Sequence, residues 1–438
     1  MTGHLLTDFF IALAIALAAA QTGGALARRV GQPPVVGEIF AGILASPTVL
    51  TASVSQHIIP GTVRPLLEGL ANIGLAVFMF TVGYEIDFAL LRGRTRAALT
   101  LATGSVVVPL TAGTLLALPL AGRYAPGDRT GFVLFLGVAM SVTAFPVLAR
   151  ILTDRGLNRK PLGGIALAAA AVGDLAAWIA LAAVVAFCGA SGQWHVMLLP
   201  VYALLLVVVV RPLFRRLTQG AGRGDVMPAA LFPALVVGLM LSCAATEWMG
   251  VHFIFGAFAF GAVMPKAGPE GLRARLIEQM ENTGSHFLLP LYFIVAGTKV
   301  DLSGFGAGTL GTLLAVIVVA VASKAVGAYA GARVSGTGHR VALPIAVLMN
   351  TRGLTEIVIV TVGLQMHLID ERFYSIMIVM AVVTTAMTGP LLNLVREGTR
   401  EDAGAEEPVP AAAAPKPAPE PVTSPSSAPE AAAGTERG

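Results

Sequence analysis

Residues 162–190 read LGGIALAAAAVGDLAAWIALAAVVAFCGA, and Asp174 is the one carboxylate in this apolar run. A helix needs roughly 20 apolar residues to cross a bilayer, so the run is long enough to span it, with Asp174 near its middle. A charged group at that depth costs a few kcal/mol on insertion scales. A sequence tolerates that cost when the carboxylate has a partner or a task. A buried Asp that bonds a neighbouring helix and holds the helices together is the structural alternative.

The composition predicts a polytopic membrane protein. The chain has 438 residues, of which 55% are hydrophobic and 12% charged, and its mean hydropathy is +0.78. Soluble domains carry about 25% charged residues. The two cysteines, Cys188 and Cys243, each lie in an apolar stretch and provide neither a disulfide framework nor a metal-ligand cluster. Residues 1–8 contain no Lys or Arg, so the first apolar run is predicted to be a retained helix and not a signal peptide.

Thirteen apolar segments follow one another, and each is a predicted membrane crossing. They are centred on residues 5–27, 35–50, 67–86, 97–120, 131–152, 162–190, 196–210, 229–245, 251–263, 287–297, 308–332, 341–364 and 373–394. Twenty Lys and Arg residues follow odd-numbered segments, whereas five follow even-numbered ones, namely Arg64, Arg123, Arg129, Lys299 and Arg372. The positive-inside rule then predicts an external N-terminus and a cytoplasmic C-terminus. This alternation also argues against a nucleic-acid partner, despite the basic isoelectric point.

The composition changes near residue 397. We expect a transmembrane domain over residues 1–396 and a disordered cytoplasmic tail over residues 397–438. The tail is rich in Ala, Pro and Glu and has too few apolar side chains to build a core. No glycine-rich nucleotide fingerprint follows the membrane part, so we expect no nucleotide-binding regulatory domain in this chain.

Two of the apolar segments are interrupted by small polar residues beside Pro or Gly. Residues 141–146 read SVTAFP in the fifth segment, and residues 350–353 read NTRG in the twelfth. Paired breaks are typical of transporters built from two inverted repeats, in which unwound helices expose backbone dipoles to an ion. Segments 1–6 and 8–13 would form these repeats, with segment 7 as connector. Alternatively, Pro146 and Gly353 only kink packed helices, since both residue types occur in membrane helices.

Lys324, Arg352 and Glu356 are the other charges deep within predicted spans. The chain has 24 Arg and 5 Lys, yet the cation in the eleventh segment is a lysine, which can lose its proton when buried whereas Arg cannot. Lys324 is therefore a candidate titratable partner of Asp174, unless it snorkels to the membrane surface. Arg352 and Glu356 are spaced i,i+4 and share a helix face, either as a structural ion pair or in contact with an ion.

The remaining candidates narrow the class of function. His252 directly precedes an apolar run, in GVHF at residues 250–253, where a satisfied interfacial histidine fits, and a pH-sensing role is the alternative. We expect no enzymatic activity, because an intramembrane protease needs a nucleophile with a base, or two carboxylates on facing helices. The membrane core offers one clear carboxylate, Asp174, with a lysine. An intramembrane carboxylate of this kind indicates an ion or proton pathway.

Seven short motifs occur in order along residues 5–395. They are GQP with VGE and AGIL at 31–44, SVTAFPVLARIL at 141–152, VGDLAAW at 172–178, GVHFIFGAF at 250–258, LLPL at 288–291, NTRGLTE at 350–356 and TTAMT at 384–388. On these motifs the chain resembles the monovalent cation:proton antiporter-2 family, and most closely its branch of plant-type cation/proton exchangers.

The resemblance implies an all-α fold of about 13 transmembrane helices, in two inverted six-helix repeats with two broken, crossing helices. It also implies that one domain forms a homodimer interface and that the other moves in an elevator-like cycle. In the family, the residue matched by Asp174 binds either an alkali cation, transiently, or protons, and the lysine matched by Lys324 lies near it. Thr143 and Asn350 match the positions where the broken helices cross.

The chain departs from much of the family at Gly173, where many members have Asp or Asn. Glycine supplies no side-chain ligand, so Na⁺ or K⁺ and H⁺ would compete at Asp174 alone. We therefore hypothesise electroneutral, one-for-one exchange. Pro146, Arg352, Gly353 and Glu356 are expected to have structural or accessory roles.

These observations predict a secondary active antiporter of the cell membrane that exchanges H⁺ for K⁺ or Na⁺, with Asp174 as the shared carrier and without a cofactor. A sodium-coupled organic anion transporter of the same fold is one alternative, and a cation channel is another. Flux against an opposing proton gradient separates them, because a channel moves its cation without obligate proton movement.

Overall fold

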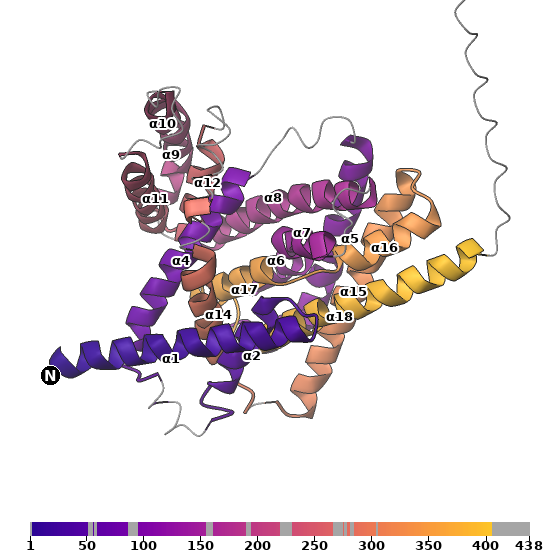
Figure 1. Ribbon diagram of the computed structural model, residues 1–438, viewed down its shortest axis with the longest axis horizontal. Coiled ribbons are helices and arrows are strands. Elements are labelled where there is room, and N and C mark those ends of the chain that lie inside the picture. The colour runs from indigo at the N-terminus through magenta and orange to yellow at the C-terminus, as the bar shows by residue number, and fades with distance from the viewer. Residues whose placement is uncertain are drawn as a thin grey trace, which may run out of the picture.

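The computed structural model describes residues 2–50, 59–85, 95–154, 161–189, 194–219, 230–265, 284–303 and 305–404, together with Gln56, Arg275 and residues 278–280. This part of the chain consists mainly of helices, and no strand occurs in it (Figure 1). The helices of the first half are α1 (Thr2–Arg29), α2 (Pro34–Leu44), α4 (Arg64–Glu85), α5 (Thr95–Tyr124), α6 (Arg129–Ser141), α7 (Phe145–Asp154) and α8 (Pro161–Gly189).

The second half begins with a span of mixed helical geometry. It consists of the 3-10 helix η2 (Trp194–Leu198), α9 (Leu199–Leu205), the π-helix η3 (Leu206–Val210) and α10 (Arg211–Gln219). The chain continues with α11 (Leu231–Trp248), α12 (Phe253–Val263), the π-helix η4 (Gly284–Leu288), α14 (Leu289–Thr298), α15 (Ala307–Val334), α16 (His339–Met349), α17 (Leu354–Gln365) and α18 (Glu371–Gly404).

Helix lengths agree with a polytopic membrane protein. In the described part of the chain, seven helices are long and apolar enough to span a bilayer, namely α1, α4, α5, α8, α11, α15 and α18. The other six predicted crossings contain shorter helices: α2, α12 and α14 stand singly, the seventh segment is the span from η2 to α10, and the fifth and twelfth segments are each split in two. The prediction of an all-α fold with short second, ninth and tenth segments is confirmed.

Small residues allow the long helices to pack closely. A Cβ atom added to Gly104 of α5 would lie 2.3 Å from the carbonyl oxygen of Gly327, and one added to Gly327 of α15 would lie 2.2 Å from that of Gly104. Gly331, one turn further along α15, approaches Thr100 of α5 in the same way. Helices in lipid associate through such close backbone contacts, because the lipid tails are as apolar as the side chains.

The helices form two groups that pack mainly within themselves. In the first, which we call the core bundle, α5 packs against α6, α8 and α15, and α15, α16 and α17 pack on α18. In the second, the flanking bundle, α2 packs against α1 and α14, and α4 packs against α12 and α14. The two bundles meet along a seam to which α12 and α14 contribute from one side and α17 and α18 from the other.

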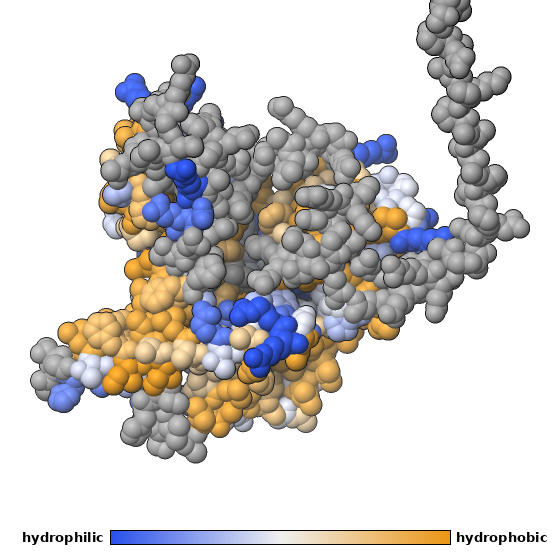
Figure 2. Space-filling model, viewed as in Figure 1, coloured by the Kyte–Doolittle hydropathy of each residue, from blue (hydrophilic) through white to orange (hydrophobic). Residues whose placement is uncertain are grey.

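The outer surface is apolar over long stretches. On α1, Leu6, Phe10 and Ile11 are each more than half exposed, and Figure 2 shows hydrophobic surface over α1 and the helices beside it. Soluble proteins rarely expose a continuous apolar surface of this extent. An apolar surface of this extent agrees with an integral membrane protein.

The expected domain boundary at residue 396 falls inside a helix. α18 begins at Glu371 and continues to Gly404, past the residue at which we expected the transmembrane domain to end. The helix is thus longer than the apolar pattern indicated, because Arg and Glu residues after the membrane span are good helix formers. Residues 405–438 lie outside the described part of the chain, and a disordered tail there stays a prediction.

Candidate ion-binding site

Two helices of the core bundle are broken, and the breaks contact each other. α6 ends at Ser141 and α7 begins at Phe145, whereas α16 ends at Met349 and α17 begins at Leu354. The amide of Ala144 in the first break donates a hydrogen bond to the carbonyl of Thr351 in the second, at 3.1 Å. The prediction of two broken, crossing helices is confirmed, and the alternative of two simple kinks is wrong.

Local sequence explains why the second helix unwinds. Gly353 has φ +151° and ψ −125°, a conformation that residues with a Cβ atom rarely adopt. The carbonyl of Arg352, which has no helical partner there, accepts a 2.7 Å hydrogen bond from the Thr385 hydroxyl of α18. In the first break, Pro146 is the second residue of α7, a position where the missing amide hydrogen of proline costs no helical bond.

Asp174 lies on α8 with its carboxylate at the start of α7. Its side chain is 5% exposed, and Oδ2 accepts a 3.3 Å hydrogen bond from the amide of Phe145, the first residue of α7. The N-terminus of a helix favours negative charge, so this position stabilises the ionised carboxylate. Oδ1 is buried and has no hydrogen-bond partner. One oxygen of the carboxylate is therefore free to bind another group.

Other buried oxygen atoms near the crossing also lack partners. Asn350 is 2% exposed, and neither atom of its side-chain amide is hydrogen-bonded. The hydroxyl of Thr355, on the first turn of α17, is fully buried and unpaired, whereas the Thr143 hydroxyl donates a long 3.4 Å bond to the carbonyl of Met349. Each unpaired buried polar group costs about 1–3 kcal/mol, which a bound ligand would offset. Carboxylate, amide and hydroxyl oxygens suit a hard cation.

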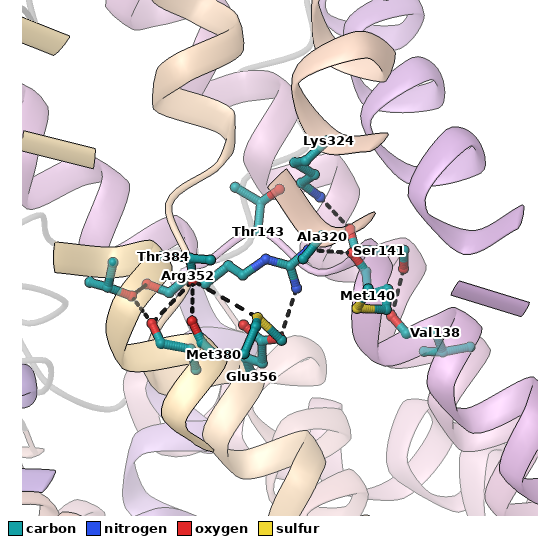
Figure 3. Close-up of polar contacts among 12 residues, drawn as sticks. Val138, Met140, Ser141, Thr143, Ala320, Lys324, Arg352, Glu356, Met380 and Thr384 are labelled. Atoms are coloured by element: carbon teal, nitrogen blue, oxygen red, sulfur yellow. Dashed lines mark hydrogen bonds and ion pairs between the residues drawn. The ribbon is translucent and has the colours of Figure 1, made fainter. Parts of the chain in front are cut away.

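Lys324 on α15 is fully buried, so the snorkelling alternative is wrong. Its ammonium group donates a 2.9 Å hydrogen bond to the carbonyl of Ser105 on α5. It also donates to the carbonyl of Ser141 at the end of α6 (Figure 3). Lys324 and Asp174 interact electrostatically, but no salt bridge joins them among the side chains that the structure describes. The lysine is therefore a nearby positive charge held by backbone carbonyls, and not a direct ion-pair partner.

Arg352 and Glu356 form a buried ion pair. Nη1 of Arg352 lies 2.7 Å from Oε1 of Glu356, and both side chains are fully buried. Nη2 of the same guanidinium donates to the carbonyl of Met140 in α6, at 2.8 Å, so the pair also joins the two broken helices (Figure 3). This geometry supports the structural interpretation of the pair over direct contact with an ion. The unwound stretch at Gly353 does not separate the two residues.

Some residues of the site were missed in the sequence. Thr385 belongs to the TTAMT motif, but its bond to the carbonyl of Arg352 could not be seen in the motif itself. Thr355 lies in the NTRGLTE motif, and its position between Gly353 and Glu356 is the signal that could have identified it. Gly173, next to Asp174, has space beside it, because an added Cβ atom would make an ordinary 3.6 Å contact with Val106.

The fold and the site define a class of protein, a helical membrane protein in which two broken helices cross beside a buried carboxylate. The chain belongs to the sodium/hydrogen exchanger family, whose transmembrane region matches residues 13–395. The resemblance found in the seven motifs is therefore confirmed.

Individual relatives agree with this family. The chain is 36% identical over 380 residues to Na(+)/H(+) antiporter NhaS4 of Synechocystis, covering 84% of this chain and 92% of that protein. It is 35% identical over 407 residues to Cation/H(+) antiporter 20 of Arabidopsis thaliana, covering 88% of this chain and 48% of the plant protein. The chain thus spans about half the length of the plant relative. The solved structure of the sodium proton antiporter MjNhaP1 from Methanocaldococcus jannaschii has the same fold, with a TM-score of 0.63, 15% identity, and coverage of 91% of this chain and 98% of that one.

Proposed function

We propose that this protein is a secondary active antiporter, and not an enzyme, that exchanges H⁺ for Na⁺ or K⁺ at Asp174. The observation that carries the proposal is the buried Oδ1 of Asp174, which has no partner although it lies where two broken helices cross. A carboxylate with one open oxygen accepts either a proton or a cation. Relatives named as sodium/proton and cation/proton antiporters support the same exchange.

Competition at one carboxylate couples the two ions. Protonation removes the charge that attracts the cation, and a bound cation excludes the proton, so neither is carried together with the other. The partnerless amide of Asn350 and the hydroxyls of Thr143 and Thr355 would complete the cation ligands as the carboxylate ionises. With Gly173 contributing no second ligand, one positive charge moves in each direction, and exchange is electroneutral.

The two bundles suggest how the site changes sides. We propose that the chain contains two inverted repeats and that the core bundle, which carries the site, slides against the flanking bundle in an elevator-like cycle. The separate internal packing of the two bundles supports this motion. Family likeness supports a homodimer in the cell membrane, and the distribution of Lys and Arg supports an external N-terminus and a cytoplasmic C-terminus.

Purified protein in proteoliposomes tests the exchange. A pH-sensitive dye inside the vesicles should report proton movement when Na⁺, K⁺ or another alkali cation is added outside. Below the pH at which Asp174 ionises, the apparent KM for the cation should rise about tenfold for each unit that the pH falls, because one proton competes with one cation. A KM that does not change with pH, or cation flux without proton movement, would contradict exchange at a shared site.

Stoichiometry needs a separate measurement. With ion gradients fixed, an imposed membrane potential should leave the exchange rate unchanged if one H⁺ exchanges for one monovalent cation. A potential-dependent rate, or a current from protein adsorbed on a solid-supported membrane, would contradict electroneutral exchange while leaving the antiport itself intact.

A further inference from the structure

One hydrogen bond links the two bundles through a histidine. Nε2 of His252, at the start of α12 in the flanking bundle, lies 2.5 Å from Oε1 of Gln365 at the end of α17 in the core bundle. His252 is only 6% exposed, whereas Gln365 is exposed to solvent. The glutamine therefore covers the histidine at the edge of the seam.

The bonding around His252 fits a neutral ring. Its Nδ1 accepts a 3.5 Å bond from the amide of Ile254 and so caps α12, which leaves Nε2 as the donor to Gln365. A proton on Nδ1 would remove this acceptor and place a positive charge at a helix N-terminus, where it is unfavourable. The neighbouring Glu247, at the end of α11, accepts a 2.8 Å hydrogen bond from the amide of Phe253.

Polar groups without partners lie behind this contact. Thr361 is one turn before Gln365 on α17, it is buried, and its hydroxyl has no hydrogen-bond partner. The hydroxyl of Tyr292 on α14, in the flanking bundle, is also buried, and it interacts with the hydroxyl of Thr361 without a hydrogen bond of normal geometry. α17 continues from here to Glu356 and Thr355 beside the break. The hydroxyls of Thr361 and Tyr292 would become hydrated if the bundles separated at this end.

We propose that the His252–Gln365 hydrogen bond is a latch between the two bundles, which closes the seam on the side of the α11–α12 turn and is released by acid on that side. This inference rests on the proposed sliding of the bundles, and adds to it a residue pair that controls access from one side. At the opposite end of the seam, Gln32 donates to the carbonyl of Ala386 at 3.2 Å, a contact without a titratable group.

The direction of the pH response follows from burial. Burial lowers the pKa of His252 below its ordinary value, and this effect outweighs the hydrogen bond to Gln365 and the nearby Glu247, both of which raise it. Glu247 is the charged group that faces the ring from α11, and α17 presents the neutral Gln365. When the seam opens, water restores the ordinary pKa of about 6.5. Because the open state then binds the proton more tightly, the population of the open state rises as the pH falls.

Cysteine accessibility tests the latch without measuring transport. We would place a cysteine at Thr361 in a chain in which Cys188 and Cys243 are serine, and label it with an impermeant maleimide from the side of the α11–α12 turn. Maleimide reacts with the thiolate, whose fraction falls with pH at any cysteine. To correct for this, the labelling rate is divided by the rate of Ala307→Cys, an exposed position at the start of α15. Between pH 8 and pH 5.5 the corrected rate should rise severalfold, because the open state binds the proton more tightly.

Two substitutions separate the latch from general effects of pH. His252→Gln cannot be protonated, so the corrected rate at Thr361→Cys should no longer change with pH. Gln365→Glu places a carboxylate against the ring and should invert the response, because a charged His252 then stabilises the closed seam. His339→Gln, which changes the histidine that contacts Tyr329 at the other end of the core bundle, is the matched control and should behave like the unmodified protein.

The outcomes distinguish the latch from the proposed exchange. An unchanged corrected rate between pH 8 and pH 5.5, or the same rise in His252→Gln, would overturn the latch even if exchange is normal. A rise that His252→Gln abolishes would support the latch even if the vesicle assay shows no antiport. In vesicles that do exchange ions, His252→Gln should retain exchange, and the competition between proton and cation at Asp174 should be unchanged.

Discussion

Asp174 and Glu356 are both buried carboxylates at a broken helix, but they are bonded very differently. Glu356 is 2.7 Å from the guanidinium of Arg352, which also reaches the carbonyl of Met140 in the other broken helix. Asp174 accepts a single 3.3 Å amide bond through one oxygen, and its other oxygen has no partner. Oε2 of Glu356 also lacks a partner, so the two carboxylates differ in what holds the bonded oxygen, which is a guanidinium at Glu356 and one backbone amide at Asp174.

The difference shows which carboxylate can exchange partners. Removing one member of a buried ion pair destabilises a protein by several kcal/mol, because the other charge is left without a partner. Glu356 therefore has little freedom to exchange Arg352 for a proton or a cation. The charge of Asp174 is balanced by weaker means, the N-terminus of α7 and the electrostatic attraction of Lys324. A weakly bonded carboxylate can change its partner at a small cost in free energy, which reversible transport requires.

The largest effect is expected for Asp174→Asn. Asparagine is isosteric and can still accept the amide of Phe145, so the protein should fold and insert normally. Exchange should fall by at least about a hundredfold, because the amide neither ionises nor takes up a proton in the working pH range. Dye-detected proton flux in proteoliposomes measures the loss, and size-exclusion elution with a thermal melt checks the fold. More than a trace of exchange in a folded variant would assign the shared site to another residue.

Substitutions in the Arg352–Glu356 pair should lower the stability of the protein without changing the coupling between H⁺ and the cation. Glu356→Gln leaves the guanidinium buried without a counter-charge and should destabilise the protein by about 3–5 kcal/mol. The double variant Arg352→Met with Glu356→Leu removes both charges and should recover a large part of that loss, as measured by thermal unfolding in detergent. If Glu356→Gln melted normally but changed the pH dependence of exchange, Glu356 would belong with Asp174 and the contrast between the two breaks would be lost.

Lys324 should have an intermediate effect. Lys324→Gln keeps a donor for one of the carbonyls of Ser105 and Ser141 but removes the positive charge near Asp174. A nearby cation favours an ionised carboxylate, so exchange should fall about tenfold at pH 7 and its optimum should move to higher pH. Vesicle assays over a pH series measure both changes. An unchanged pH profile with reduced thermal stability would limit Lys324 to holding the two carbonyls.

Much of this arrangement could be predicted from the sequence, because lipid imposes patterns that are local in the chain. The length of the apolar run around Asp174, the alternation of Lys and Arg, and the polar interruptions at residues 141–146 and 350–353 each depend on neighbouring residues alone. The same is true of the i,i+4 spacing of Arg352 and Glu356. These features gave the fold class and the two broken helices.

The bonding of the site could not be predicted, because it joins backbone groups that are distant in the chain. Lys324 binds the carbonyls of Ser105 and Ser141, and any residue at those two positions would present the same carbonyl. The sequence therefore suggested Asp174 as the partner of Lys324, because Asp174 is a side chain of opposite charge within a predicted membrane span. α18 likewise continues past the apolar pattern that marked the expected boundary at residue 396, because helix propensity does not end where the apolar residues end.

The smallest effect, and the one that defines Asp174 most closely, is expected at Gly173. Gly173→Ala should leave exchange within about twofold and stabilise α8 by up to about 1 kcal/mol, since the added methyl meets only an ordinary contact with Val106. Gly173→Asp fits the same space but adds a second titratable group beside the first, and exchange should then depend on membrane potential. The Cβ atom of either variant makes the same contact with Val106, so the two variants differ mainly in charge. Currents measured on a solid-supported membrane therefore test the effect of that charge. A current in Gly173→Ala, or none in an active Gly173→Asp, would show that the stoichiometry is not set by the number of carboxylates at this position.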